Sequence, residues 1–217
     1  MSFSVTTEMM AFAVATARAA GDVIMEIYNT DFDVRSKDDG SPVTEADERG
    51  EALIRARLED AYPEIPFIGE EAYGAGHKPV VDGGLFWLVD ALDGTKEFIH
   101  KRGEFTVNIA LIDAGVPVFG VVHAPAKNRT FWGAHSHGAF AADGESPPHG
   151  ITTRTPEADG LVVVASRSHR SGEEKFLKQF TIKETVTSGS FQLAQSKLNL
   201  AGNLIQRSGL LLLQCGR

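Results

Sequence analysis

The sequence predicts an α/β protein, because helix-forming and strand-forming stretches alternate along the chain. Two amphipathic helix patterns lie within residues 6–61, and strand-like apolar runs follow between residues 66 and 142. The most telling run is Phe86-Trp87-Leu88-Val89, which is apolar throughout and therefore typical of a strand buried on both faces of a sheet. A second block with the order strand, helix, strand is expected between residues 161 and 187.

Two helices are expected before the first strand of this run. The first begins after Thr6 or Thr7 and ends at about Tyr28. Its apolar residues recur three and four apart and so share one buried face: Met9, Ala13, Ala17, Ala20, Ile24 and Ile27. The second helix begins at Thr44, has the capping-box spacing to Asp47 and stops before Pro63. Its apolar face is expected to carry Leu53, Ile54, Leu58 and Ala61. The cap alone accounts for Asp47, so a functional role for it needs other support.

Polar segments separate these helices from the central strand. Residues 31–42 are rich in turn-forming residues and predict a short strand followed by a loop that carries Lys37. A short strand over residues 66–69 ends on Glu70 and Glu71, and a Gly-rich loop, a candidate flap, is expected over residues 72–84. Paired glutamates are usually solvated, but the ends of strands are where α/β proteins place their ligands.

The residues after Phe86–Val89 combine oxygen ligands with free backbone N–H groups. Asp90 and Asp93 follow the strand, and Gly94-Thr95 allows a sharp turn into a helix. Two carboxylates and the Leu92 carbonyl suit a hard divalent cation, and a helix start suits a phosphate. The stretch indicates a place where Mg²⁺ and a phosphate meet. Taken alone, it leaves open a simple tight turn in which one aspartate caps the next helix.

The strands that follow are expected to form hairpins. Phe105–Ile112 and Val116–Val122 are strand-like and are separated by a turn sequence, and Thr130–Ala142 predicts another strand pair. His135 and His137 would share one face of a strand there. Because no third ligand is nearby in the sequence, surface histidines are preferred over a metal site.

The second block begins at Ile151. A strand over Leu161–Ala165 runs into Ser166-Arg167-Ser168-His169, a helix is expected around residues 173–180 and a strand around residues 184–187. At the end of a buried strand the Ser-Arg-Ser-His segment is suited to binding a phosphate or a base. A plain polar loop is the alternative.

Composition narrows the classes of function. The 217 residues are 42% hydrophobic and 23% charged, as in ordinary globular proteins. A net charge of −8 argues against a nucleic-acid polymer as partner, whereas a small phosphorylated substrate is compatible because bound metal ions reverse the local field. The single cysteine, Cys215, excludes a disulfide framework and a Cys-based zinc site. With no transmembrane run and no signal-peptide pattern, a cytoplasmic location is expected, with peripheral attachment at the inner membrane as a variant.

Four motifs stand in order along the chain: Val43-Thr44-Glu45-Ala46-Asp47, Gly69-Glu70-Glu71, Asp90-Ala91-Leu92-Asp93-Gly94-Thr95-Lys96-Glu97-Phe98 and Gly103-Glu104-Phe105-Thr106-Val107-Asn108. Together they resemble the Mg²⁺-dependent, lithium-sensitive phosphatases of the inositol monophosphatase superfamily. The Lys-Glu-Phe, the Gly-Glu-Phe-Thr-Val-Asn and the Ser-Arg-Ser-His are similar, more narrowly, to the bacterial 3'(2'),5'-bisphosphate nucleotidase branch (the CysQ type) of sulfur metabolism. Its members convert adenosine 3',5'-bisphosphate to AMP and phosphate. The resemblance extends to about Ser190.

The resemblance implies a fold, a cofactor and a set of site residues. The fold would be a layered α/β/α/β/α sandwich of the inositol monophosphatase and fructose-1,6-bisphosphatase type, and the cofactor two or three Mg²⁺ ions. Asp90 would bridge two of the ions, Asp47 and Thr95 would orient a metal-bound water, and the N–H groups of Gly94 and Thr95 would receive the phosphate. The implied catalytic residues are Asp47, Glu70 and Thr95; the metal ligands are Glu70, Asp90, Leu92 and Asp93; the substrate-binding residues are Glu70, Leu92, Asp93, Gly94, Thr95, Ser166 and His169.

The carboxyl-terminal part departs from the family. Residues 1–150 are expected to form an α+β metal-binding subdomain, residues 151–190 the start of an α/β subdomain, and residues 191–217 a tail unlike the family. The family has a third metal-binding aspartate in a late Trp-Asp-x-Ala-Ala segment, whereas this chain has no acidic residue after Glu184. If the closing leucines, Leu210 to Leu213, are encoded by CTG codons, the same bases shifted by one or two positions encode Cys or Ala. Our hypothesis is a frameshift near residues 189–191, which would leave the fold incomplete and weaken the second metal site.

Three functions are compatible with these patterns. The first is a Mg²⁺-dependent phosphomonoesterase that hydrolyses adenosine 3',5'-bisphosphate with a metal-activated water. The second is an inositol or sugar phosphate monophosphatase with the same metal site. The third is a non-catalytic remnant that binds Mg²⁺ or phosphate without turnover. The expected partners are a small phosphorylated nucleotide and, in a homodimer, a second copy of the chain.

Overall fold

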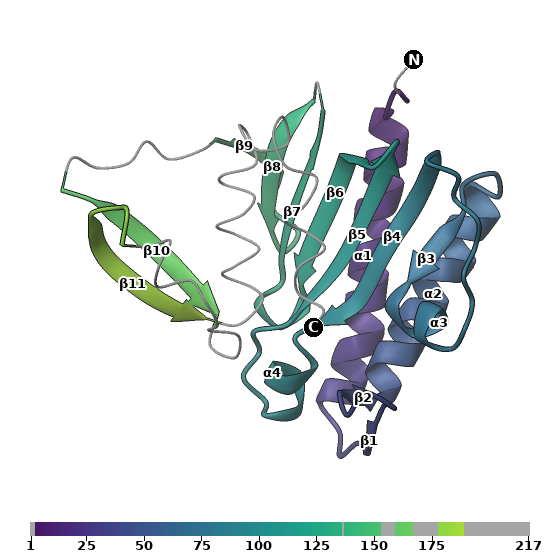
Figure 1. Cartoon of the computed structure of the whole chain (residues 1–217), viewed down its shortest axis with the longest axis horizontal. Coiled ribbons are helices and arrows are strands. Elements are labelled where there is room, and N and C mark those ends of the chain that lie inside the picture. Colours follow the sequence, from purple (N-terminus) through teal and green to yellow (C-terminus); the bar gives the residue numbers. More distant parts are fainter. Residues whose placement is uncertain (1–2, 136, 153–158, 167–177, 189–217) are drawn as a thin grey trace.

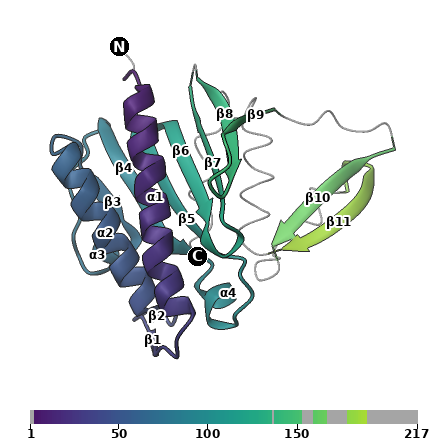
Figure 2. The same cartoon turned by 180° about the vertical axis from the view of Figure 1, so that it is seen from behind.

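A mixed seven-stranded sheet forms the centre of the protein. The computed structural model describes residues 3–135, 137–152, 159–166 and 178–188. The strand order is β3-β4-β5-β6-β7-β8-β9, and only β3 and β4 run parallel to each other. Helices α1 (Thr7–Tyr28) and α2 (Glu45–Ala61) pack side by side on one face of the sheet (Figures 1 and 2). The predicted α/β class is confirmed.

The strands of this sheet are β3 (Phe67–Gly69), β4 (Leu85–Asp93), β5 (Thr106–Asp113), β6 (Val116–Ala124), β7 (Arg129–Ala134), β8 (Gly138–Asp143) and β9 (His149–Ile151). Short helices interrupt the chain between them: α3 (Glu70–Gly74), α4 (Thr95–Ile99) and the 3₁₀ turn η1 (Pro125–Lys127). Two small sheets stand apart: β1 (Val34–Ser36) pairs antiparallel with β2 (Pro42–Thr44), and β10 (Leu161–Ser166) pairs parallel with β11 (Ile182–Ser188).

Both long helices begin at the predicted caps. The Thr6 hydroxyl accepts a hydrogen bond from the Met9 N–H at 3.1 Å, and Thr44 forms the capping box of α2. Every residue predicted for the buried face of α1 is buried. On α2 the prediction is wrong for Ala61, which is exposed. The helix ends there, and the next residue, Tyr62, makes the apolar contact by packing its ring against Phe12 and Trp87.

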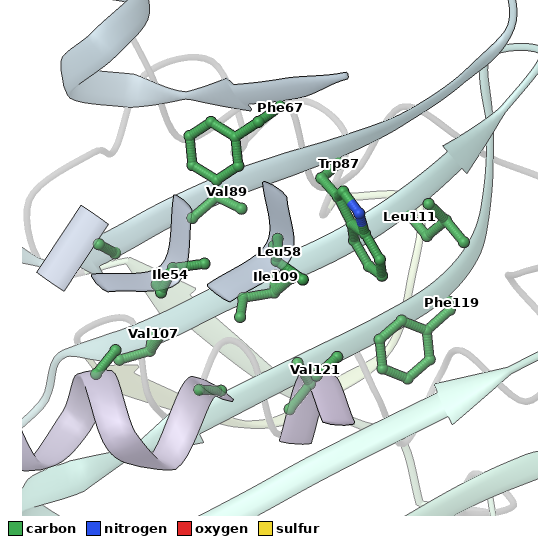
Figure 3. Close-up of a cluster of buried hydrophobic side chains, with 14 of the residues drawn as sticks. Ile54, Leu58, Phe67, Trp87, Val89, Val107, Ile109, Leu111, Phe119 and Val121 are labelled. Carbon is green, nitrogen blue, oxygen red and sulfur yellow. The ribbon is translucent and has the colours of Figure 1, made fainter. Parts of the chain in front are cut away.

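The hydrophobic core lies between the two helices and the sheet (Figure 3). It contains Ile54 and Leu58 from α2 together with inward-facing residues of four neighbouring strands. These strand residues are Phe67, Trp87, Val89, Val107, Ile109, Leu111, Phe119 and Val121. Their alternation along each strand places the intervening residues, Asn108 among them, on the opposite face. The core therefore fixes the register of the strand ends that carry the acidic residues.

Three local predictions need correction. Strand β4 does not end at Val89 but continues through Asp90 to Asp93, because its pairing with β5 continues. The expected loop over residues 72–84 begins later, since residues 70–74 are helical. His135 and His137 do not share a strand face, because both lie in the turn between β7 and β8. Both are exposed, in agreement with the preferred surface interpretation.

The remaining strands are confirmed in outline. The hairpin β5–β6 turns at Ala114 and Gly115, which both have positive φ (50° and 78°). Strands β10 and β11 match the runs expected in the second block. The helix expected around residues 173–180 lies mostly outside the described residues, and residues 178–180 form a turn. Within the described ranges, no helix is both long enough and apolar enough to cross a membrane.

Candidate metal centre

Glu70 directly follows β3, and Asp90 lies at the corresponding position of the neighbouring parallel strand β4. Gly69 of β3 is paired with Val89 of β4, so the next residue of each strand is an acid at the same edge of the sheet. Helices α3 and α4 begin at this edge (Figure 1). The register of one strand pair therefore brings together two acids that are 20 residues apart in the sequence.

A β-bulge places Asp90 and Asp93 on the same face of β4. Residues three apart in a regular strand point to opposite faces. Here Asp90 is paired with Asn108 and Asp93 with Thr106, so two residues of β4 stand opposite Val107 alone. Because Asn108 and Thr106 are two apart and share a face, their partners share it too. The Asn108 amide donates a hydrogen bond to Asp93 Oδ2 at 3.3 Å.

The charges near Asp90 repel one another. Burial raises the pKa of Asp90 well above its ordinary value, and the negative charges of Asp93, Glu70 and Asp47 raise it further. The Leu92 N–H, which donates to Asp90 Oδ1 at 3.1 Å, opposes the shift only in part. An additional cation at this point would relieve the repulsion, and the oxygen-only donor set is the one that Mg²⁺ prefers.

Asp47 makes hydrogen bonds both to Thr44 at the start of its own helix and to Thr95. Its Oδ2 accepts hydrogen bonds from the Thr44 N–H at 2.8 Å and the Thr44 hydroxyl at 2.7 Å, which completes the cap of α2. Its Oδ1 accepts a hydrogen bond from the Thr95 hydroxyl at 3.1 Å. Burial raises the pKa of Asp47, and these hydrogen bonds offset part of the rise. The same carboxylate thus joins α2 to the start of α4.

Gly94 turns the chain from β4 into α4. Its φ of 102° and ψ of 39° are in the left-handed region, which glycine adopts at little cost. Thr95 is the first residue of α4, and its hydroxyl also lies 3.3 Å from the Leu92 carbonyl oxygen. In the described part of the chain, no side chain caps α4. The backbone N–H groups of this turn therefore suit an anion, as the sequence predicts.

Glu70 is held by a cation of the protein itself. Lys37, at the turn between β1 and β2, donates hydrogen bonds to Glu70 Oε1 and Glu71 Oε1, each at 2.7 Å. Burial lowers the pKa of Lys37, but the two glutamates outweigh it and leave that pKa raised. The Glu70 side chain remains 54% exposed. Lys37 was predicted only as a loop residue, so its contact with both acids is an addition.

The predicted residues share one region without forming a closed ligand cluster. Among the residues that the structure describes, no three His, Cys, Asp or Glu side chains converge tightly enough to hold a metal ion as they stand. Ser166 is the last residue of β10, whose side-chain placement at that point is not described, and His169 lies outside the described residues. Asn108 was missed as a contact of Asp93, although it stands in a motif that the sequence singles out.

The comparisons with known proteins agree on one family. The model of the inositol monophosphatase family matches residues 6–204, a span that ends inside the segment predicted to be a tail. The 3'(2'),5'-bisphosphate nucleotidase CysQ of Shigella flexneri is 42% identical over 181 residues, which is 80% of this chain and 70% of that protein. Inositol monophosphatase 1 of Sus scrofa is 30% identical over 171 residues, which is 72% of this chain and 61% of that protein.

Solved structures show the same fold. The CysQ structure from Bacteroides thetaiotaomicron has a TM-score of 0.69 and 27% identity, covering 93% of this chain and 86% of that chain. The suhB protein from Bartonella henselae has a TM-score of 0.71 and 25% identity, covering 88% and 74%. The fold and the acidic strand ends thus define a phosphatase with the layered α/β sandwich. The chain belongs to the inositol monophosphatase family.

Proposed function

We propose that this chain is a Mg²⁺-dependent phosphomonoesterase that hydrolyses adenosine 3',5'-bisphosphate to AMP and phosphate. The observation that carries the proposal is the group of mutually repelling acids at the ends of β3 and β4, next to the open start of α4. Such a group suits metal ions and a phosphate together. The choice of substrate is supported by the similarity to several proteins named 3'(2'),5'-bisphosphate nucleotidase CysQ.

The acids of this site would hold the ions. Glu70, Asp90 and the Leu92 carbonyl would bind one Mg²⁺, and Asp90 and Asp93 a second, with a third ion as the upper limit. Mg²⁺ supplies positive charge that neutralises the phosphomonoester and lowers the pKa of water. Lys37 donates to Glu70 Oε1, so an ion bound at that oxygen would displace Lys37, whereas an ion bound at Oε2 would leave the contact in place.

Asp47 and Thr95 would handle the proton of the attacking water. The Thr95 hydroxyl donates to Asp47 Oδ1, so its own lone pairs remain acceptors toward the substrate side. As the water oxygen bonds to phosphorus, the water gives a proton to Thr95 and Thr95 passes its own to Asp47. The pKa of Asp47, raised by burial, makes it a better proton acceptor than an exposed aspartate. The leaving 3'-oxygen takes its proton from solvent.

The turn into α4 would bind the transferred phosphoryl group. The N–H groups of Gly94 and Thr95 stand at a helix start, where the partial positive charge of the helix attracts phosphate oxygens. Hydrogen bonds that are already oriented there can stabilise the charge that builds up during in-line displacement. Ser166 and His169 remain proposed contacts of the nucleotide.

Phosphate release tests this function directly. The purified chain is assayed with adenosine 3',5'-bisphosphate and with inositol 1-phosphate, in Mg²⁺ and in EDTA. We expect the wild type to release phosphate from the nucleotide in Mg²⁺ but not in EDTA. The Asp90→Asn variant should release no phosphate in either condition. Asp143→Asn, a change of an exposed residue on β8, four strands away from β4 in the sheet, is the matched control and should keep wild-type turnover. Equal turnover of Asp90→Asn would remove Asp90 from the metal site.

The same assay separates the two alternatives. The similarity to the inositol monophosphatase of Sus scrofa favours an inositol or sugar phosphate as the second candidate substrate, and preferential release from inositol 1-phosphate would establish it. Mg²⁺ binding in calorimetry without turnover of either substrate would establish the non-catalytic remnant. The proposed tail, residues 191–217, lies outside the described residues. Resequencing the gene tests the frameshift: an intact frame without a downstream Trp-Asp-x-Ala-Ala would contradict it.

Two further expectations belong to this proposal. A cytoplasmic location would place the enzyme with a small nucleotide substrate, and fractionation of cells into soluble and inner-membrane material tests it. A homodimer is expected in solution, and sedimentation at several protein concentrations tests it.

A further inference from the structure

We propose that Glu51 is a positioning residue of the metal centre: it holds the first turn of α3 against α2 and thereby sets where Glu70 stands. The inference rests on the proposed function, in which Glu70 binds Mg²⁺. Glu51 lies on α2 and has no bond to Glu70 among the described contacts, so its influence acts through the backbone of α3.

Glu51 supplies the cap that α3 does not have of its own. The residue before α3 is Gly69, which has no side chain to cap the helix. Glu51 Oε2 accepts the Glu71 N–H and Oε1 accepts the Ala72 N–H, each at 2.7 Å. The residue is only 4% exposed. Because both oxygens accept hydrogen bonds, the ionised carboxylate fits this position, and a negative charge at a helix start is favourable.

Gly69 is explained by the same contact. Its φ of −112° and ψ of 155° are extended values that any residue adopts, so the backbone does not require glycine there. A Cβ at this position would lie 2.4 Å from Glu51 Cδ and 2.6 Å from each of its oxygens. A side chain at residue 69 would therefore push the Glu51 carboxylate off the N–H groups of α3. Space for Glu51 is the reason for this glycine.

Helix α2 connects the two sides of the site through one face. Asp47 and Glu51 are four residues apart and so lie one turn from each other on that face. Asp47 accepts a hydrogen bond from Thr95 at the start of α4, and Glu51 accepts two from the start of α3. Helix α2 thus positions the starts of both α3 and α4. Lys37 completes the arrangement by holding the side chains of Glu70 and Glu71 from the outside.

The Mg²⁺ affinity of the substrate-free chain tests this role. Glu51→Gln keeps the volume but turns an NH₂ group toward one of the two N–H donors. We expect calorimetry to show Mg²⁺ binding about 10- to 100-fold weaker than in the wild type, as is typical when the support of a metal ligand is lost. Glu48→Gln is the matched control on the same helix, because Glu48 is exposed and bonded only to Arg35 among the contacts described. Its Mg²⁺ affinity should not change.

Turnover measurements should also distinguish a positioning role of Glu51 from a general loss of structure. For Glu51→Gln the Mg²⁺ concentration at half-maximal rate should rise by the same factor, while kcat at saturating Mg²⁺ stays near the wild-type value. A general loss of structure would instead lower kcat and the helical circular dichroism together. Wild-type Mg²⁺ affinity in a folded Glu51→Gln variant would overturn the positioning role.

The glycine provides an independent test. Gly69→Ala should reproduce the weaker Mg²⁺ binding without removing a charge, and adding it to Glu51→Ala should have little further effect, because the atoms it would displace are gone. If Glu51→Gln does not fold, Gly69→Ala alone decides, and unchanged Mg²⁺ affinity there overturns the role. No Mg²⁺ binding by the wild type would contradict the proposed function itself, whereas wild-type binding that neither substitution alters contradicts only the role of Glu51.

Discussion

Replacing Asp90 with Asn should make the metal-free protein more stable while it removes the activity. The pKa of Asp90 is raised well above its ordinary value by burial and by Asp93, Glu70 and Asp47. A carboxyl whose pKa is higher in the folded than in the unfolded state costs about 1.4 kcal/mol for each unit of difference, at any pH above both values. Asparagine has nearly the same shape, carries no charge and can still accept the Leu92 N–H bond.

The size of the effect follows from the neighbouring charges. In addition to the cost of burial, which is the larger cause, a like charge roughly 6 to 12 Å away contributes about 1–3 kcal/mol at an effective dielectric of about 20. We therefore expect the free energy of unfolding of Asp90→Asn to be about 1–3 kcal/mol higher than that of the wild type in EDTA at neutral pH. For a chain of this size, that corresponds to a rise in Tm of roughly 2–12 °C.

The pH dependence gives the sign of the argument. At pH values below the pKa of Asp90 in the unfolded state, about 4, this carboxyl is protonated in both the folded and the unfolded state. Its ionisation then makes no difference between the stabilities of the wild type and Asp90→Asn. The wild type should then lose stability relative to Asp90→Asn as the pH rises from about 4 through the raised folded pKa. Beyond that pKa the difference should be constant.

Thermal unfolding in EDTA and in Mg²⁺, over a series of pH values, measures all of this. Mg²⁺ should raise the Tm of the wild type and have much less effect on Asp90→Asn, since binding to the folded state is what stabilises it. Asp143→Asn, which removes the ion pair between the exposed Asp143 and the half-buried Arg129, should lie within about 1 kcal/mol of the wild type. The reasoning is refuted if Asp90→Asn is the less stable protein in EDTA, or if Mg²⁺ stabilises both proteins equally.

Three further predictions concern other parts of the structure. Burial, and to a lesser extent Arg18, lowers the pKa of His123 to about 4. The free energy of unfolding should therefore fall by up to about 3 kcal/mol as the pH falls from 6.5 to 4, and should not depend on the ionisation of His123 above pH 6.5. Urea unfolding should show this slope, and His123→Asn should flatten it. Gly94→Ala should cost about 1–2 kcal/mol in the same assay, because an L side chain is strained at φ 102°, and should abolish phosphate release. Trp87→Ala should cost about 3–5 kcal/mol, because Trp87 is fully buried in the core, and a loss below 1 kcal/mol would show that the core is not packed as described.

Local sequence signals predicted most of the elements. Thr6 and Thr44 mark the helix starts because a cap needs only its own helix, and the spacing of apolar residues fixes the buried face of α1. Helix α3 was missed because its cap comes from Glu51 on another helix, which no window of neighbouring residues contains. Strand β4 was predicted too short because Asp90 and Asp93 look like an ending, although the pairing with β5 continues past them.

The site was predictable as a set of residues but not as a geometry. The family resemblance identified five of the site residues, and the structure brings them to one edge of the sheet: Asp47, Glu70, Asp90, Asp93 and Thr95. Their assignment as ligands and catalysts stays a prediction. The contacts of Lys37 with Glu70 and Glu71 depend on how β1 and β2 place a loop in space. Long-range placement of this kind leaves no periodic trace in the sequence.

Asp90 and Asp93 share a face of β4 because the number of residues between them differs from the number in the neighbouring strand. Two residues separate the aspartates in β4, whereas one residue separates their partners in β5. Removing Ala91 would leave every acid in the chain and shorten the gap to the even spacing of a regular strand, so Asp90 and Asp93 would still stand opposite Asn108 and Thr106. The deletion would instead remove the bulge and the local bend of the backbone that comes with it. An alignment would score such a protein as nearly intact, yet the Leu92 N–H and carbonyl would lose the positions in which they meet Asp90 and Thr95.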